Sequence, residues 1–354
     1  MPAIWLAECT QSRDNNTKLL RHAAALAVVA FHSFALTNHF VQEPLWRVFP
    51  ETNLGLLGVQ IFFVLSGFLI TQSWMANPRL RIFAVARILR IYPALFAATF
   101  FTILLAGYSS TLPWTEFLRS PQTRHYLLHT ASAIDVTELL PGAFTTNPYP
   151  RAANGSLWTL PVELRLYAVI AVAGIVGLLR RCRLWAIVIV AITVVLAVRP
   201  DSIPIRLRND SVLSLASLFV LASAAYSMRS RILILPSVAG ICVLLYVWNP
   251  FGYVRGALAL PMLVYVVLVV AYHPRLRWRT PTFNGVGDYS YGIYVYTFPI
   301  QQTVTMLWPS IDPWTLFGAA LPLGVTVAAA SWHWIEAPAL GLKRRLTARA
   351  TMPK

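Results

Sequence analysis

Charged residues are scarce in this sequence. Only 12% of its 354 residues are Asp, Glu, Lys or Arg, about half the roughly 25% that is usual in soluble globular proteins. Hydrophobic residues make up 57% of the chain, and the mean hydropathy is +0.61. This composition excludes an ordinary soluble domain and predicts an all-α integral membrane protein.

Acidic residues are scarcer still, with 13 Asp and Glu against 29 Lys and Arg, which gives a formal net charge of +16. Such an excess can indicate nucleic-acid binding. Here the arginines cluster in short segments between apolar runs, as the positive-inside rule describes for cytoplasmic loops. We therefore expect contact with membrane lipids and no nucleic-acid partner.

Cysteines are few and isolated. Cys9, Cys182 and Cys242 have neither the spacing of a zinc site nor that of a disulfide framework. No metal site and no bound cofactor is expected. The apolar run after Lys18 and Arg21 could open a signal peptide, but no small-residue cleavage site followed by a soluble domain is present. We therefore expect a retained first helix.

The apolar runs predict about ten transmembrane helices in one bundle around an intramembrane cavity. Their expected ranges are 20–38, 55–75, 84–107, 156–178, 184–199, 211–228, 231–248, 257–272, 287–308 and 313–338. The expected organisation is a cytoplasmic N-terminal tail (1–17), a transmembrane domain (18–340) and a basic cytoplasmic C-terminal tail (341–354).

Arginines in the connecting loops set the expected orientation. The loops after the second, fourth, sixth and eighth helices, and the C-terminal tail, carry more arginine close to the helix ends than the alternate set. Those loops should be cytoplasmic. Both termini then lie in the cytoplasm, and the protein is expected in a bacterial inner membrane. The long loop of about 108–155 then faces outward, and we expect it to act as a lid on the acceptor side.

Arg21 and His32 are candidate site residues on the first helix. Eleven residues separate them, so on a helix they leave the same face, roughly 16 Å apart along the axis. Ionisable groups on a membrane helix are costly unless they face protein, water or a ligand. The pattern fits an anion holder at one end and a proton acceptor at the other, or else a juxtamembrane arginine and a packed histidine.

Polar residues in the next two helices are further candidates. Ser66 and Gly67 allow another helix to approach closely, and Gln60 is a polar group in an apolar run. Arg87 and Arg90 lie three residues apart on one helix face. Paired guanidinium groups suit phosphate oxygens, although contact with lipid headgroups explains them equally well.

Glu163 follows the turn that ends the long loop. It lies within a predicted membrane span, so it is a functional candidate unless it forms a buried ion pair between two helices. Arg165 is two residues away and cannot face it on a helix. Near the last two helices, we expect Asp288 to be an N-cap and Glu336 to form a surface ion pair with the basic residues Lys343 to Arg345.

Six motifs in order resemble the acyltransferase-3 family of polytopic membrane O-acyltransferases, over about residues 18–345. They are the Arg21–His32 spacing, Phe62 to Phe68 (FFVLSGF), Arg90 to Pro93 (RIYP), Gly155 to Trp158 (GSLW) with Glu163, Ser290 to Tyr294 (SYGIY), and Glu336 to Pro338 (EAP). Many family members have a histidine where Thr297 stands. Some carry an additional C-terminal hydrolase-like domain, which is not expected in a chain that ends at Lys354.

The resemblance implies transfer of an acyl group, often acetyl, from a cytoplasmic acyl-CoA such as acetyl-CoA to a sugar hydroxyl of a cell-surface or lipid-linked glycan. It implies that His32 is catalytic, with Arg21 as its motif partner. Histidine suits the task because its unperturbed pKa of about 6.5 allows it to accept a hydroxyl proton. We expect Glu163 to be catalytic as well, and Arg21, Arg87 and Arg90 to bind the donor. Gln60, Ser66, Trp158 and Tyr291 are expected to line the cavity.

Two other classes of protein fit the same composition. A transporter or flippase for a glycan or another anionic substrate would also place arginine, histidine and glutamate in a polytopic core. A binding or scaffold protein would need no chemistry at all. The order of the six motifs and the absence of an inverted repeat favour the enzyme.

Overall fold

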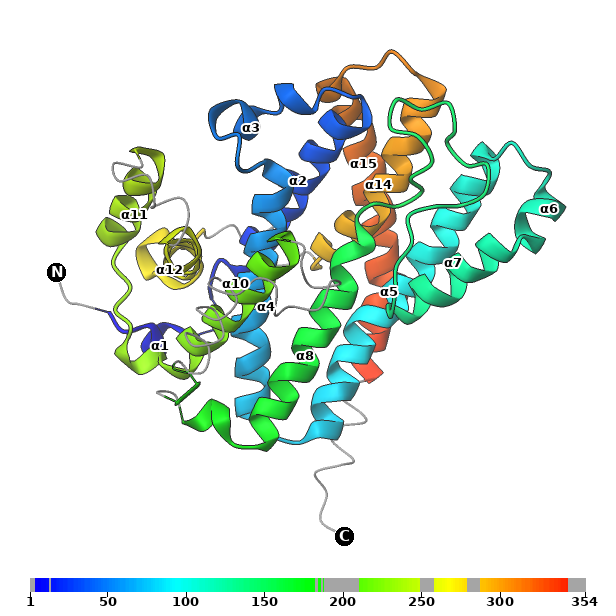
Figure 1. Cartoon of the computed structure of the whole chain (residues 1–354). Helices are drawn as coiled ribbons and strands as arrows, with labels where there is room; N and C mark the ends of the chain where they lie inside the picture. The colour runs from blue at the N-terminus through cyan, green and yellow to red at the C-terminus, as the bar shows by residue number, and fades with distance from the viewer. Residues whose placement is uncertain are drawn as a thin grey trace, which may run out of the picture. The chain divides into compact units, whose positions relative to one another are not determined.

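The computed structural model describes residues 4–12, 14–181, 184, 185, 187, 210–248, 258–278 and 287–342. Within these ranges the chain is helical and its only strand-like pairs are isolated bridges, so the predicted all-α class is confirmed for them. Five helices, some extended by adjoining helical turns, are long and apolar enough to cross a membrane: Thr17–Leu36, Leu54–Ala76, Leu80–Ser109, Leu157–Ile175 and Pro313–Leu342. Figure 1 shows the helices along the chain.

The predicted helices agree with the observed ones to within a few residues at most ends. The observed long helices are α2 (Thr17–Leu36), α4 (Leu54–Ala76), α5 (Leu80–Ser109), α8 (Leu160–Ile175), α10 (Asp210–Ser227), α11 (Pro236–Trp248), α12 (Ala259–Tyr272), α14 (Ser290–Leu307) and α15 (Pro313–Ser331). The predicted helix 184–199 lies almost wholly outside the described residues. Hydropathy alone was therefore sufficient to locate these segments.

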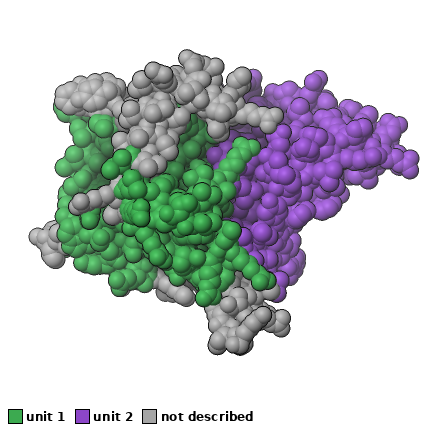
Figure 2. All heavy atoms as spheres, turned by 60° about the horizontal axis from the view of Figure 1, so that its bottom comes forward, with its two compact units in different colours: residues 1–21, 60–83, 165–281 green, residues 22–59, 84–164, 282–354 purple. Residues whose placement is uncertain are grey.

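The chain forms two compact units, coloured separately in Figure 2. Unit 1 comprises residues 1–21, 60–83 and 165–281, and unit 2 comprises residues 22–59, 84–164 and 282–354. Four of the five boundaries between them fall inside α2, α4, α5 and α8, and the fifth, at 281/282, lies outside the described residues.

Unit 1 packs α10 and α12 around the second half of α4. Its core includes Leu65, Phe68, Leu218 and Leu268. Gly67 lies directly against the backbone of Phe219, and a Cβ atom there would meet its carbonyl group. The expected close approach of another helix at Gly67 is therefore confirmed.

The N-terminal segment is part of this unit rather than a loose tail. A short helix, α1 (Leu6–Cys9), carries the fully buried Leu6, whose backbone N–H donates to the carbonyl of Ile232. The Asn16 side chain donates to the carbonyls of Val270 and Leu276 at 2.9 and 2.6 Å. Buried amides bonded in this way fix the segment that leads into α2.

Unit 2 contains the helices that surround His32. Small residues again allow close packing: Gly58 on α4 lies against Ala24 and Val28 of α2, and Gly292 on α14 lies against Ala328 of α15. Between α2 and α4, the buried Glu43 caps the short helix α3 (Pro44–Val48) and also accepts from the N–H of Leu54 at 3.1 Å.

The long loop of about 108–155 is a folded part of unit 2. It contains α6 (Trp114–Arg119) and α7 (Pro121–Ser132), with a core of Phe117, Tyr126 and Phe144. Asn147 donates to both the backbone and the side-chain carbonyl of Gln302 on α14, at 2.9 and 2.6 Å. Buried hydrogen bonds to α14 thus hold the segment that was expected to act as a lid.

Candidate active site

His32 lies in the second half of α2, where its ring is almost fully buried, with 9% exposed. Its ring meets the ring of Phe298 on α14, with centroids 4.9 Å apart and planes at 84°. The Phe31 ring lies 5.5 Å away. In the described part of the chain no side chain or backbone group hydrogen-bonds to this imidazole, and the ring contacts found there are with Phe31 and Phe298.

Gln301, one turn beyond Phe298, fastens α14 to the turn of α2 that carries His32. Its side-chain amide nitrogen donates to the carbonyl of Val29 at 2.9 Å and to the hydroxyl of Ser33 at 2.7 Å. Gln301 is fully buried. Gln301 thus holds α2 before and after His32, and Phe298 contacts the His32 ring itself.

The loop before α8 supports Phe298 from the other direction. A Cβ atom on Gly155 would lie 2.8 Å from the Phe298 ring, so only glycine leaves room for that ring. Asn154 anchors the turn: its side-chain nitrogen donates to the carbonyl of Val295 at 2.9 Å, and its oxygen accepts from the N–H of Ser156 at 3.1 Å. The Gly155 motif is therefore a packing element of the His32 site.

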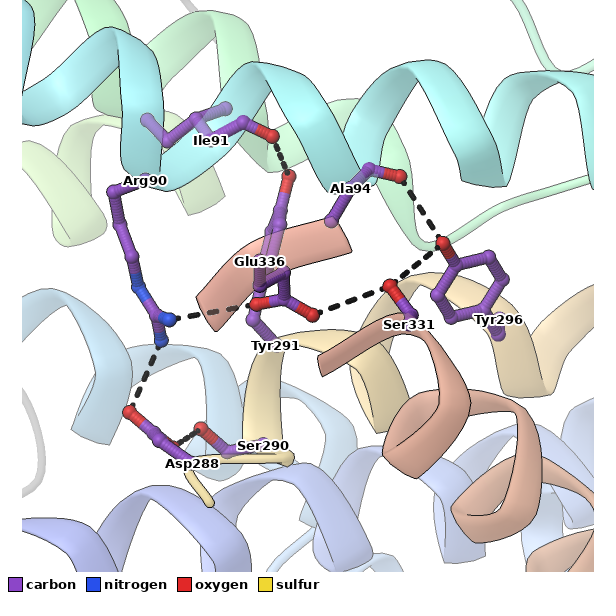
Figure 3. A network of polar contacts seen from close by, with 9 residues as sticks. All are labelled: Arg90, Ile91, Ala94, Asp288, Ser290, Tyr291, Tyr296, Ser331 and Glu336. Atoms are coloured by element: carbon purple, nitrogen blue, oxygen red, sulfur yellow. Dashed lines mark hydrogen bonds and ion pairs between the residues drawn. The ribbon is translucent and has the colours of Figure 1, made fainter. Parts of the chain in front are cut away.

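A second polar group of residues surrounds Arg90 on α5, as Figure 3 shows. One guanidinium nitrogen lies 3.0 Å from the Asp288 carboxylate, and the other lies 3.4 Å from the Glu336 carboxylate. The guanidinium carbon lies 5.9 Å from the centre of the Tyr291 ring and 5.7 Å from that of Trp332. Arg90 thus has an acidic and aromatic cage made by the ends of two other helices.

Two predictions about these acidic residues are wrong. Glu336 is fully buried and pairs with Arg90, so it is not at the surface; Lys343 to Arg345 lie outside the described residues. The N-cap of α14 is Tyr289, while Asp288 accepts from the Ser290 hydroxyl at 2.6 Å and pairs with Arg90. In both cases a cation distant in sequence provides the partner.

The other predicted residues are distributed over both units. In unit 2, Glu163 lies in the first turn of α8, and its side chain is half-buried. Half-buried side chains of this unit also include Arg87 on α5 and Trp158 in the turn of 3-10 helix that precedes α8. Arg165 is exposed and belongs to unit 1.

Three predicted residues belong to unit 1. Arg21 is half-buried in the first part of α2, and Gln60 is half-buried in α4. Ser66, also on α4, has its hydroxyl 3.2 Å from that of Tyr167 on α8. This contact agrees with the expected role of Ser66 in helix packing.

Thr297 on α14 is a buried packing residue. Its side chain is 1% exposed and its hydroxyl donates to the carbonyl of Ile293 at 2.7 Å. It lies directly against Gly324 of α15. A larger side chain at this position would separate the two helices.

Sequence reasoning missed Phe298 and Gln301. Phe298 follows directly after Thr297 in an apolar run, and nothing in that run distinguishes it from other buried aromatics. Gln301 and Gln302 do give a signal, because two adjacent amides within a membrane helix need buried partners. The α2 partners of Gln301 and the loop partners of Gln302 supply them.

These features describe a helical protein with membrane-length apolar helices and, in unit 2, a buried histidine. A family model described as an acyltransferase domain matches residues 15–333. The chain therefore belongs to the acyltransferase-3 family, and the prediction that it is an acyltransferase enzyme is confirmed. This membership favours the enzyme over the transporter and the scaffold.

Curated relatives agree with this membership. The chain is 26% identical to an O-acetyl transferase of Shigella phage Sf6, over 92% of this chain and 95% of the phage protein. It is 29% identical to nodulation protein 10 of Rhizobium leguminosarum, over 97% of each. It is 25% identical to a putative peptidoglycan O-acetyltransferase of Bacillus subtilis, over 90% of this chain and 54% of that protein. No solved structure matches the chain.

Proposed function

We propose that the protein transfers an acetyl group from cytoplasmic acetyl-CoA to a hydroxyl of a cell-surface or lipid-linked glycan, in a bacterial inner membrane. The names of the phage and Bacillus relatives support O-acetyl transfer. The observation that carries the proposal is the buried His32 ring, which Phe298 and the Gln301-anchored turn of α2 hold in one orientation.

In the proposed reaction His32 is the general base. It removes the proton from the acceptor hydroxyl while that oxygen attacks the thioester carbonyl. The carbon–oxygen ester bond forms, the carbon–sulfur bond breaks, and the CoA thiolate leaves and takes up a proton. A buried site favours this step because hydrogen bonds to the developing oxyanion are stronger where water is excluded.

Arginines on α2 and α5 are proposed to hold the anionic part of the donor. A guanidinium group can grip phosphate oxygens in a bidentate manner, which an ammonium group cannot. We assign this role to Arg21 and Arg87. Arg90 completes the predicted donor-binding set, although the carboxylates of Asp288 and Glu336 lie against its guanidinium group.

Glu163 is proposed to act on the acceptor side. Its half-buried carboxylate lies in the first turn of α8, after the turn that carries Gly155. A carboxylate there can orient a sugar hydroxyl by hydrogen bonding. Gln60, Ser66, Trp158 and Tyr291 remain candidates for lining the cavity.

The proposed orientation has both termini in the cytoplasm and the 108–155 loop outside. It rests on the arginine-rich loops and on the positive-inside rule. Residues 18–340 then form the membrane domain between two cytoplasmic tails.

The function is tested by mass spectrometry of surface glycans from wild-type and deletion strains. The deletion strain should lose an O-acetyl ester from one glycan. Plasmid-borne wild-type protein should restore it, whereas the His32→Ala protein should not. Identical acetylation in wild type and deletion strain would refute the proposal.

A further inference from the structure

Arg90 is engaged on both sides by residues of this chain. The Asp288 and Glu336 carboxylates lie 3.0 and 3.4 Å from its two terminal nitrogens. Glu336 is fully buried, and a buried carboxylate requires a cationic or hydrogen-bonding partner. Two carboxylates outnumber the single positive charge of Arg90, so an incoming donor phosphate would meet acidic groups on both sides of the guanidinium.

The contacts of Arg90 continue through Glu336 into a longer chain. The second Glu336 oxygen accepts from the Ser331 hydroxyl at 3.3 Å, and that hydroxyl lies 3.0 Å from the Tyr296 hydroxyl. The Tyr296 hydroxyl donates to the backbone carbonyl of Ala94 on α5 at 3.3 Å, and the Tyr291 hydroxyl donates to that of Ile91 at the same distance. Figure 3 shows this chain of contacts joining α5 to α14 and to the end of α15.

A π-helical turn brings Glu336 into this network. The turn covers Trp332–Glu336, and the wider spacing of a π-turn rotates the residues after it relative to a regular α-helix. The indole of Trp332 packs directly against Gly287, and His333 lies 3.0 Å from the Tyr289 hydroxyl. The start of α14 and the end of α15, which form the cage around Arg90, are therefore also held by contacts with each other.

The network reaches His32 through α14. Tyr291 and Phe298 are seven residues apart on that helix, which is about two turns and roughly 10 Å. Phe298 contacts the imidazole, and Gln301 holds the backbone of the same turn of α2. Because one helix, α14, carries both sets of contacts, we expect a change in the position of its first turn to shift Phe298 and Gln301.

We propose that Arg90 is a positioning residue that, with Asp288 and Glu336, sets the position of α14 and thereby the orientation of His32. This inference rests on the proposed function, in which His32 is the base. It removes Arg90 from the donor-binding set and leaves Arg21 and Arg87 there.

The experiment measures acetyl transfer in purified membranes for Arg90→Gln, Glu336→Gln, Asp288→Asn and the double variant Arg90→Gln/Glu336→Gln. Acetyl-CoA is titrated at fixed acceptor, and rates are divided by the amount of tagged protein. Each single change should lower kcat by about 10- to 100-fold, the equivalent of one lost charge-assisted contact. The donor KM should stay within about twofold of wild type, since no donor contact is lost.

The double variant separates a shared network from independent contacts. Its kcat should be no lower than that of Arg90→Gln alone, because residues of one network are not additive. Arg81→Gln is the matched control: Arg81 is an exposed arginine on the same helix, and its replacement should leave both constants unchanged. If Arg90→Gln fails to accumulate, Arg90→Lys takes its place and should keep part of kcat with an unchanged donor KM.

Two results would overturn the proposal. One is a raised donor KM with wild-type kcat in Arg90→Gln or Arg90→Lys, which would return Arg90 to the donor site. The other is wild-type kinetics in Glu336→Gln and Asp288→Asn. His32→Ala is measured alongside: its full activity would refute the proposed function, whereas its inactivity together with either of these results would refute only the role of Arg90.

Discussion

The rings of His32 and Phe298 meet nearly at a right angle, with centroids 4.9 Å apart. Perpendicular aromatic pairs of this kind contribute about 0.5–1.5 kcal/mol beyond the area they bury. In the part of the chain that is described, this packing takes the place of the hydrogen bond that often orients a catalytic histidine. If His32 is the base, as proposed, the position of Phe298 should determine how well it acts.

Gly155→Ala should impair catalysis through Phe298. The new methyl group would lie 2.8 Å from the Phe298 ring and force it to move, at a typical overpacking cost of about 1–3 kcal/mol. If the misplaced ring raises the activation free energy, kcat should fall by about tenfold for each 1.4 kcal/mol. The measurement is acetyl transfer in membranes, normalised to protein amount.

Gly318→Ala is the control for this prediction. Gly318 lies inside α15 with open space around its Cβ position, so alanine there should be neutral or slightly stabilising. Phe298→Leu added to Gly155→Ala should restore part of the activity because it relieves the overlap. A Gly155→Ala enzyme with wild-type kcat would show that Phe298 does not set the geometry.

Arg21→Lys should raise the donor KM. Lysine keeps the charge but loses the planar fork that grips a phosphate. Loss of a charge-assisted contact of about 1.5–3 kcal/mol predicts roughly a 10- to 100-fold increase. Acetyl-CoA titration at fixed acceptor measures it, with Arg81→Lys as the exposed control. An unchanged donor KM with full kcat would mean that Arg21 only anchors α2 at the headgroups, a role that lysine fills equally well.

Cysteine labelling should place the long loop outside the cell and the segment after α12 inside. Ile134 is 70% exposed and Trp278 is 63% exposed, so both positions accept a reagent. In a chain from which Cys9, Cys182 and Cys242 have been removed, Ile134→Cys should react with an impermeant maleimide on intact spheroplasts. Trp278→Cys should react only after lysis, and the reverse pattern would invert the proposed orientation.

Glu138 should make the outer loop less stable as the pH rises. Burial raises the pKa of this carboxyl above its ordinary value of 4.5, so the folded loop favours the protonated form. Stability is then greatest below the ordinary pKa and is lost as the pH rises through the raised one. Glu138→Gln should remove this dependence in limited proteolysis at a series of pH values.

Glu116→Gln is the control, because Glu116 is exposed on α6 and its replacement should leave the pH dependence of cleavage as it is in wild type. Equal protection of wild type and Glu138→Gln at every pH would contradict the assignment to Glu138.

The helices were predictable because their signal is local. Each apolar run indicates a helix without information from the rest of the chain, and the arginine clusters between the runs mark the loops. Gly67 was also predictable, because a glycine beside a serine in an apolar run indicates close helix packing. The structure confirms that contact at Phe219.

The partners of the polar residues were not predictable from one sequence. Arg90 lies 198 residues from Asp288 and 246 from Glu336, and nothing local to either acid indicates Arg90. The nearby basic tail and the position of Asp288 before a helix suggested simpler roles, which were wrong. The π-turn that brings Glu336 inward has no sequence signature that period counting detects.

The central claim is that His32 takes the acceptor proton. The most direct test is acetyl transfer from labelled acetyl-CoA in purified membranes that contain equal amounts of wild-type and His32→Ala protein. General-base catalysis contributes about 10²- to 10⁴-fold. We therefore predict a kcat reduced by that factor, a donor KM close to wild type and normal accumulation of the variant in the membrane. Wild-type product formation by His32→Ala would contradict the account.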